Sequence, residues 1–188
     1  MNSLNREQRT RILNLLTEGT SIRAITRVTG VSKTTVAKLV VDAGATCAWY
    51  QDRVFRNLEC KRVQVDEIWG FVGAKQKNAD PDKIASGEAG DVWPWFAANA
   101  DTKLVPCWLV GGRDAEYAME FMDDLRERLA NRVQLTSDGH AAYLQAVEGA
   151  FGGDVDYAML VKCASPAATF KLAHYPKKPG QDSAPTIG

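Results

Sequence analysis

The sequence predicts a mixed α/β protein in which three short N-terminal helices precede a domain with the element order β-β-β-α-β-α. Two observations lead to this prediction. Apolar residues recur at helical spacing through residues 5–41, with glycines where the segments end. From residue 62 the apolar residues become β-branched and aromatic, in runs separated by turn-forming residues, and a helical pattern returns after residue 114. A chain of 188 residues with 45% hydrophobic residues suits a small module and a medium-sized domain.

The first two helices are marked by apolar stripes and by the residues that end them. Residues 5–18 form an amphipathic pattern that stops at Gly19. A second, shorter helix follows, which Thr20 or Ser21 can cap and which Gly30 breaks. The sequence therefore predicts two helices joined by a tight turn.

A third helix is expected from Ser32, as its cap, to about Val41. Three short helices with a glycine turn are typical of a helix-turn-helix, whose last helix enters the major groove of DNA with its N-terminal residues at base edges. A structural three-helix bundle with no DNA role is the alternative. The DNA-binding interpretation assigns contacts to the polar faces of the second and third helices: Arg23, Arg27, Lys33, Thr34, Thr35 and Lys38.

Charge is distributed unevenly although the formal net charge is zero. Residues 1–45 carry seven Lys and Arg against three Asp and Glu, and the rest of the chain carries sixteen against twenty. Because affinity for nucleic acid depends largely on neutralising phosphates, the basic segment indicates double-stranded DNA as a partner; solvated surface charge is the other interpretation. The four cysteines form no CxxC pair and no run of about 18 apolar residues occurs, so we expect a cytoplasmic protein without a membrane segment.

Composition divides the rest of the chain into three parts. Residues 46–61 have no clean period and are interpreted as a linker with room for a short helix. Residues 62–162 carry the strand and helix patterns of the second domain. Residues 163–188 are rich in Pro, Ala, Lys and Ser and lack periodicity, so we expect a disordered tail there.

The second domain begins with three predicted strands, at residues 62–73, 92–99 and 104–110, which suggest an antiparallel meander. Residues 74–91, between the first two strands, are rich in Lys, Asn, Asp, Gly and Ser and predict a long exposed loop. Asp114 can then cap a helix that runs to about residue 130. A short strand at 133–136 and a helix at 140–149 complete the order.

Two aspartates fall where strands would present them, Asp66 inside the first strand and Asp138 just past the fourth. Because side chains alternate along a strand, we expect Asp66 and Glu67 to face opposite sides, so that only one of them can join Asp138. Converging carboxylates are ligands for hard cations such as Mg²⁺ or Mn²⁺, and two such ions about 4 Å apart support phosphoryl transfer. On the residues alone, strand-end acids satisfied by backbone donors are an equal alternative.

The segments VQVDEIWGFVGAKQKN (63–78) and LTSDGHAAY (135–143), together with the preceding helix-turn-helix pattern, resemble the transposases of the first bacterial insertion-sequence family, here called IS-one-like. The resemblance covers roughly residues 6–162. It implies a DDE recombinase with an RNase H-like catalytic domain that binds two Mg²⁺ ions through two Asp and one Glu, with Asp66 as the first acid and Asp138 as the second. It also implies that the DNA partners are insertion-sequence ends and target DNA, with two copies of the protein pairing on the DNA.

The sequence departs from the family at the third acid. That residue should come from a helix well downstream of Asp138, whereas Glu148, the last glutamate, follows Asp138 by only ten residues. We therefore expect an incomplete RNase H-like domain and a transposase impaired by truncation. The alternatives are a non-catalytic helix-turn-helix DNA-binding repressor or regulator, and a transcription regulator with an unrelated ligand-sensing domain.

Several other side chains have a functional and a structural interpretation. Lys75 and Lys77 follow the first strand and either steer DNA toward the metals or lie in a solvated loop. His140 either contacts the site or is solvated or packed, and Arg113 is assigned to an exposed, charge-paired face without function. The tryptophans in predicted strands are interpreted as core residues: Trp69, Trp93, Trp95 and Trp108.

Overall fold

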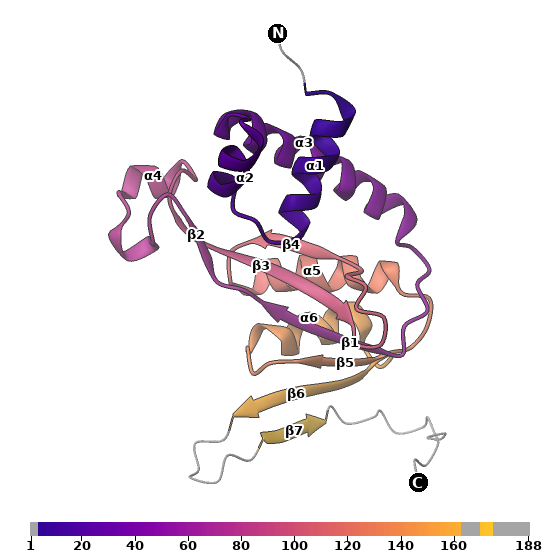
Figure 1. Ribbon diagram of the computed structural model, residues 1–188. Coiled ribbons are helices and arrows are strands. Elements are labelled where there is room, and N and C mark those ends of the chain that lie inside the picture. Colours follow the sequence, from indigo (N-terminus) through magenta and orange to yellow (C-terminus); the bar gives the residue numbers. More distant parts are fainter. Residues whose placement is uncertain (1–3, 163–169, 175–188) are drawn as a thin grey trace. The chain divides into compact units, whose positions relative to one another are not determined.

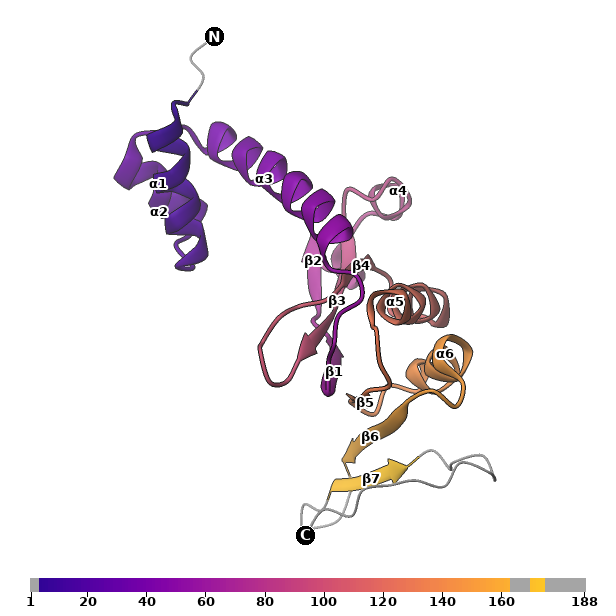
Figure 2. The ribbon, with the colours of Figure 1, turned by 90° about the vertical axis from the view of Figure 1, so that its right-hand side faces the viewer.

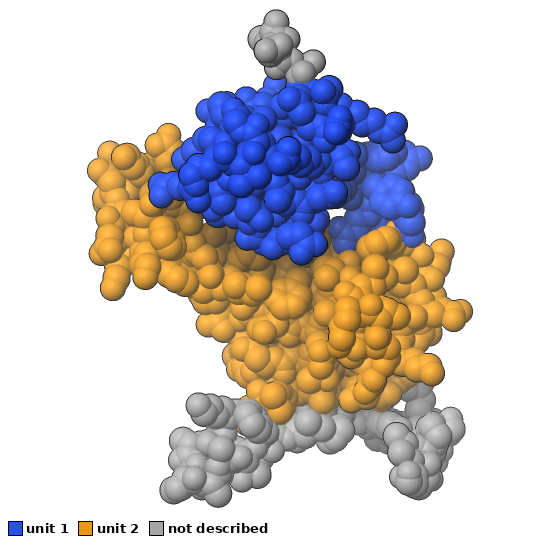
Figure 3. Space-filling model, in the orientation of Figure 1, with its two compact units in different colours: residues 1–54 blue, residues 55–188 orange. Residues whose placement is uncertain are grey.

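The computed structural model describes residues 4–162 and 170–174, and the chain forms a mixed α/β protein, as predicted. It divides into two compact units, Met1–Val54 and Phe55–Gly188 (Figure 3). The helices are α1 (Arg6–Thr17), α2 (Ile22–Thr29), α3 (Lys33–Val54), α4 (Pro81–Ala85), α5 (Ala115–Arg128) and α6 (Ala142–Phe151), with the 3-10 turn η1 (Gln76–Asn78). The strands are β1 (Arg62–Glu67), β2 (Gly70–Val72), β3 (Gly90–Asn99), β4 (Trp108–Gly111), β5 (Gln134–Ser137), β6 (Asp156–Lys162) and β7 (Phe170–His174).

The first unit consists of three helices whose ends are set by local hydrogen bonds. Asn5 caps α1 in a reciprocal pair with Gln8, in which the Gln8 backbone N–H donates to Asn5 Oδ1 at 2.8 Å. Ser21 caps α2, and Gly30 ends it with φ of 72°, a left-handed conformation that favours glycine. Each helix contributes one buried residue to a shared core: Ile12, Ile25 and Val36. The predicted cap at Ser21 and the predicted break at Gly30 are confirmed, whereas the cap at Asn5 was not predicted.

The third helix is longer than predicted. The sequence analysis ended it near Val41 and made residues 46–61 a linker, whereas α3 continues without interruption to Val54 (Figure 2). Apolar and polar residues do not alternate at helical spacing in the second half, so periodicity gave no signal there. Three alanines in residues 42–54 favour the helix through their intrinsic propensity. The linker prediction was therefore wrong over most of its length.

The second unit is built on one mixed sheet (Figure 1). In the part of the chain that the structure describes, the strand order is β2-β3-β1-β5-β6-β7, and β4 pairs with β3. β1 lies at the centre, antiparallel to β3 and parallel to β5, with Val65 opposite Ala97 on one side and Ser137 on the other. β5 and β6 are also parallel, whereas β6 and β7 are antiparallel.

Helices α5 and α6 pack against the same face of this sheet (Figures 1 and 2). Asp114 caps α5 as predicted, its Oδ1 accepting from the backbone N–H groups of Glu116 and Tyr117. The alternation of β1 places Val63 and Val65 in the core beneath these helices. The largest buried side chains of this core come from the sheet and from both helices: Trp95, Phe121, Met122, Leu125, Leu135 and Tyr143.

The strands differ from the prediction in three places. The predicted strand 62–73 is divided into β1 and β2, but both pair with β3, and the backbone N–H of Ile68 still donates to the Pro94 carbonyl. The predicted loop 74–91 contains η1 and α4, and the strand predicted at 104–110 shortens to β4. The helices were missed because each is only one turn long.

The sequence analysis missed the last two strands. β6 begins at Asp156 and pairs with β5 in a parallel ladder, so it depends on a partner that is distant in the sequence and no local pattern predicted it. β7 falls within the tail that was expected to be disordered, and the rest of that tail, residues 163–169 and 175–188, lies outside the described residues. No helix among the described residues has the length and apolar character needed to cross a membrane.

The cysteines offer a direct test of this core. Cys107 and Cys60 are buried, and burial raises the pKa of both thiols, whereas Cys47 on α3 is exposed. Because the thiolate is the nucleophile, iodoacetamide at pH 8 is expected to alkylate Cys47 within minutes and the two buried cysteines at least about tenfold more slowly. Peptide mass spectrometry would give the rates, with guanidinium-unfolded protein as the control. Equal rates in the folded protein would contradict this core assignment.

Candidate metal centre

The acidic residues meet where two parallel strands end. Asp66 and Glu67 are the last residues of β1, and Asp138 directly follows β5. Because Val65 lies opposite Ser137 in the parallel ladder, both strands deliver their following residues to the same edge of the sheet. One carboxylate oxygen of each acid lies within 4.8 Å of the others. The predicted neighbours Asp66 and Asp138 are therefore brought together, and a third acid joins them.

The participation of Glu67 corrects the sequence analysis, which allowed only one of Asp66 and Glu67 to join Asp138. The expected alternation is present, since Asp66 is exposed and Glu67 points into the helix-covered face. The carboxylates nevertheless converge, because Asp66 Oδ1 accepts a hydrogen bond at 2.9 Å from the backbone N–H of Glu67. That bond turns the Asp66 carboxylate along the strand toward its neighbour.

Glu67 is held by two partners from outside the strand. Its side chain is 1% exposed, and Arg113, in the turn before α5, donates to Oε1 through Nη2 at 2.6 Å and Nε at 2.7 Å. The Tyr143 hydroxyl on α6 donates to Oε2 at 2.9 Å. Burial, and then the charge of Glu67, raise the pKa of Tyr143, so the phenol stays protonated as the donor. Both oxygens of Glu67 are thus occupied.

Arg113 contacts the acidic cluster, which the sequence analysis missed. It was assigned to an exposed charged face, but its guanidinium pairs with buried Glu67 and lies 4.6 Å from the centre of the Trp93 ring. Its side chain remains 39% exposed, so it links the buried carboxylate to solvent. Glu67 and Arg113 are separated by 46 positions, and no local pattern connects them.

Asp138 is oriented by the turn that follows β5. Its Oδ1 accepts from the backbone N–H of His140 at 3.0 Å. The preceding Ser137 is buried, and its hydroxyl donates to the Asp138 carbonyl at 2.8 Å and lies 2.6 Å from the Tyr157 hydroxyl. Burial raises the pKa of Tyr157. These bonds fix the backbone from which Asp138 projects.

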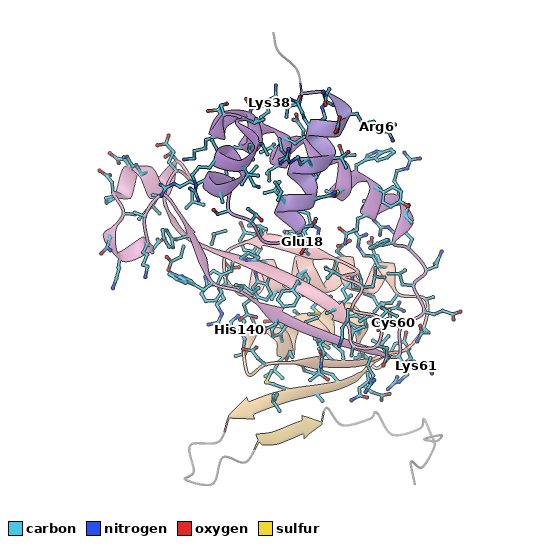
Figure 4. The ribbon with its side chains drawn as sticks, viewed as in Figure 1. Arg6, Glu18, Lys38, Cys60, Lys61 and His140 are labelled. Carbon is cyan, nitrogen blue, oxygen red and sulfur yellow. The ribbon has the colours of Figure 1, made fainter. Side chains whose placement is uncertain are left out.

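His140 supports the site by packing. Its ring lies 5.8 Å from the ring centres of both Trp95 and Tyr143. Its Nε2 is buried and has no hydrogen-bond partner among the described residues. Figure 4 marks His140 at one end of the sheet and Cys60 at the other, so the histidine shares the edge where β1 and β5 end. The geometry favours the packed interpretation of this residue.

The chemistry of these donors fits a hard divalent cation. Carboxylate oxygens are the ligands that Mg²⁺ and Mn²⁺ prefer, with remaining positions left to water and substrate phosphate. Three carboxylates against the single cation of Arg113 leave a surplus of negative charge at the cluster. Asp66 and Asp138 form no ion pair within residues 4–162 and 170–174, which leaves their charge for such an ion.

The predicted DNA-binding side chains of the first unit lie on the surfaces of α2 and α3. Thr35 is an exception, because it is half-buried and its hydroxyl lies 2.8 Å from Ser32 Oγ at the start of α3. Its side chain serves the cap, so it is the weakest of the candidates. The other candidates are exposed: Arg23, Arg27, Lys33, Thr34 and Lys38. The Arg and Lys side chains among them form no ion pair in the described part of the chain.

In the second unit, Lys75 and Lys77 are exposed beside β2, as expected for a loop. Lys75 is not merely solvated, because its Nζ lies 4.9 Å from the centre of the Trp69 ring. The interpretation of all four strand tryptophans as core residues is right for Trp95 and for Trp93, which packs on the core. It is wrong for Trp69 and Trp108, which are 41% and 47% exposed.

The geometry of this cluster is the basis for any functional assignment. Comparison with known proteins adds no relative: no family model matches the chain, and no curated protein matches it.

Proposed function

We propose that the protein is the transposase of a bacterial insertion sequence, a DDE-type enzyme that cuts and joins DNA at a divalent-metal centre. The observation that carries the proposal is the convergence of Asp66, Glu67 and Asp138 within 4.8 Å at the ends of two adjacent parallel strands. The element order supports an RNase H-like domain, since β1, β3 and β4 form an antiparallel meander that α5, β5 and α6 follow. IS-one-like transposases are the family that the sequence resembles.

Asp66 and Asp138 are the residues that would hold the metal. Each uses one oxygen to accept a backbone N–H, from Glu67 and His140 respectively, and this fixes the direction of the carboxylate. When bound, Mg²⁺ or Mn²⁺ supplies positive charge that stabilises the charge developing on a phosphate under attack. Arg113 lowers the repulsion among the three carboxylates by pairing with Glu67. The chain's own part is thus to orient two ligands and balance the charge of the third acid.

The first unit would bind double-stranded DNA as a helix-turn-helix, at the insertion-sequence ends, with two copies pairing on the DNA. Lys33 and Thr34 begin α3 and are exposed, which suits base contacts by the N-terminal residues of a recognition helix. Arg23, Arg27 and Lys38 are free to neutralise phosphates. Target DNA would be engaged near the acidic cluster.

A second candidate is a non-catalytic DNA-binding repressor or regulator. Both oxygens of Glu67 are occupied by Arg113 and Tyr143, which leaves two carboxylates with unoccupied oxygens at the cluster. Glu148 does not join the cluster and is exposed on α6. This favours a protein that binds the ends of the element without cutting them.

Nicking of a supercoiled plasmid that carries candidate element ends distinguishes the two. With Mg²⁺ or Mn²⁺, the native chain is expected to nick the plasmid. Asp66→Asn and Asp138→Asn are each expected to reduce the nicking rate about 100-fold or more, since losing even a residue that only hydrogen-bonds to a metal ligand lowers metal affinity or activity about 10- to 100-fold. Asp123→Asn, on the exposed face of α5, is the matched control and should retain activity. Nicking that persists in Asp66→Asn, or without a metal, would refute the proposed enzyme. If the native chain binds DNA but does not nick it, the non-catalytic repressor or regulator would be the favoured function.

A further inference from the structure

Next to the acidic cluster lies an exposed group of two aromatic rings and a cation, here called the aromatic surface: Trp69, Phe71 and Lys75. Phe71 is 48% exposed, close to the value for Trp69. The two ring centres lie 5.8 Å apart with a tilt of 37°, and Lys75 Nζ lies 4.9 Å from the Trp69 ring and 6.0 Å from the Phe71 ring. Large aromatic groups exposed together usually mark a binding surface.

The Trp69 ring is held in place by its edge. The backbone N–H of Gln76 and the side chain of Trp69 both hydrogen-bond to Asp91 and lower the pKa of that carboxyl. Gln76 and Asp91 are themselves joined twice, by Gln76 N to Asp91 Oδ1 at 3.0 Å and Asp91 N to Gln76 Oε1 at 3.1 Å. The indole therefore presents its exposed part in a fixed orientation, which reduces the entropy lost when a ligand stacks on it.

The aromatic surface is continuous with the strand that carries the acids. Trp69 follows Glu67 by two residues, and the pairing with β3 keeps one register from Glu67 opposite Trp95 to Gly70 opposite Val92. Trp69 therefore lies on the same face of the sheet as Glu67, with its Cα atom at most about 7 Å from that of Glu67. The backbone N–H of Ile68 donates to Pro94 O, and this bond keeps the intervening backbone on the sheet. A strand of DNA whose phosphate lies at the acidic cluster, to which Glu67 belongs, would therefore bring its neighbouring nucleotide within reach of Trp69.

We propose that the aromatic surface stacks an unpaired nucleotide of the DNA strand that enters the acidic cluster, an inference that rests on the proposed function. Aromatic rings stack on the faces of bases, and those faces are accessible only where bases are unpaired, because in a duplex each base is covered by its neighbours. Lys75 and Lys77 supply the positive charge that follows the phosphate backbone of such a strand. Apolar side chains alone would suit a protein partner, but the cations favour a polyanion.

The test measures binding by the full chain in the absence of divalent metal, so that no cleavage is needed. The probes are a 12-nucleotide single strand containing 2-aminopurine and the matching duplex. Trp69→Leu is expected to weaken single-strand binding about tenfold or more while duplex binding changes less than about twofold, whereas Trp69→Phe keeps most of the affinity because it keeps an aromatic face. Trp108→Leu, at a tryptophan of similar exposure on β4, is the control and should change neither.

The native chain adds a readout that needs no variant: 2-aminopurine fluorescence should be quenched on binding, and Lys75→Gln should reduce affinity in the same direction. Unchanged single-strand binding in Trp69→Leu, or an equal loss of binding in Trp108→Leu, would overturn the inference. The inference would also fail if light scattering showed that the native chain is a dimer and that Trp69→Leu, but not Trp108→Leu, is a monomer, because the aromatic surface would then be a dimer interface. If Trp69→Leu fails to fold, the single-strand affinity of Phe71→Leu and the 2-aminopurine quenching by the native chain test the inference instead. If the native chain nicks plasmid but Trp69→Leu has no effect on single-strand binding, only this inference fails. If Trp69→Leu weakens single-strand binding but the native chain does not nick, only the proposed enzyme activity fails.

Discussion

Replacing Arg113 with methionine is expected to destabilise the second unit by about 3 kcal/mol. Removing one partner of a buried ion pair typically costs about 3–5 kcal/mol because the remaining charge is left uncompensated. Glu67, at 1% exposure, is such a charge, but Arg113 is 39% exposed, so water already reaches the pair and the lower end applies. Urea unfolding followed by circular dichroism would give the change in the free energy of unfolding.

The chain contains a matched control for this substitution. Arg126 has the same side-chain exposure as Arg113 and pairs with Asp154 at 2.9 Å, but Asp154 is largely solvated. Arg126→Met is therefore expected to cost less than about 1 kcal/mol. Added Mn²⁺ should restore more stability to Arg113→Met than to the native chain, since the ion would compensate the same negative charge. Equal destabilisation by the two substitutions would mean that the buried carboxylate does not depend on Arg113.

Replacing Trp95 with alanine is expected to cost about 3–5 kcal/mol, the range for large aromatic residues removed from a core. Trp95 is fully buried, its ring packs edge-on against Tyr143 at 5.5 Å and beside Phe121 at 6.0 Å, and its indole N–H donates to the Gly112 carbonyl at 2.9 Å. A domain's whole stability is about 5–15 kcal/mol, so most of it would be lost. Guanidinium unfolding gives the measurement.

Trp108→Ala is the control for this second substitution, because Trp108 lies on β4 and is about half exposed. Its cost is expected to stay near 1 kcal/mol. If the cluster binds a divalent ion as proposed, Trp95→Ala should also weaken that binding, because the Trp95 ring packs against His140, whose backbone N–H orients Asp138. A Trp95→Ala protein as stable as Trp108→Ala would show that the core is organised differently.

Local signals in the sequence were sufficient for α1, α2 and the start of α3, and for the start of α5. A cap such as Ser21 or Asp114 and a stop such as Gly30 act within four residues, so a sequence pattern contains all that is needed. The same reasoning failed for the second half of α3, where no apolar stripe marks a helix. It also failed for β6, because a strand in a parallel ladder depends on a partner far away in the chain.

The candidate site was predictable in part for the same reason. Asp66 and Asp138 could be placed because each lies at a strand end, which is a local feature. The inclusion of Glu67 depends on how the Asp66 carboxylate bends back onto the backbone, and its pairing with Arg113 depends on a turn 46 positions away. Strand alternation alone therefore gave the wrong answer at the one place where the strand ends.

The parallel pairing of β1 with β5 also determines when the acidic cluster can form during synthesis of the chain. Arg62 pairs with Gln134, so a nascent chain must extend 72 residues beyond Arg62 (134 − 62) before β1 finds its second neighbour. Until then the meander of β1, β3 and β4 has an open edge that can pair with other chains. The carboxylates of Asp66 and Asp138 meet only when β5 pairs with β1, and β6 and β7 extend the sheet beyond β5. Divalent-ion binding, if the cluster holds such an ion as proposed, would therefore report that β5 has paired with β1.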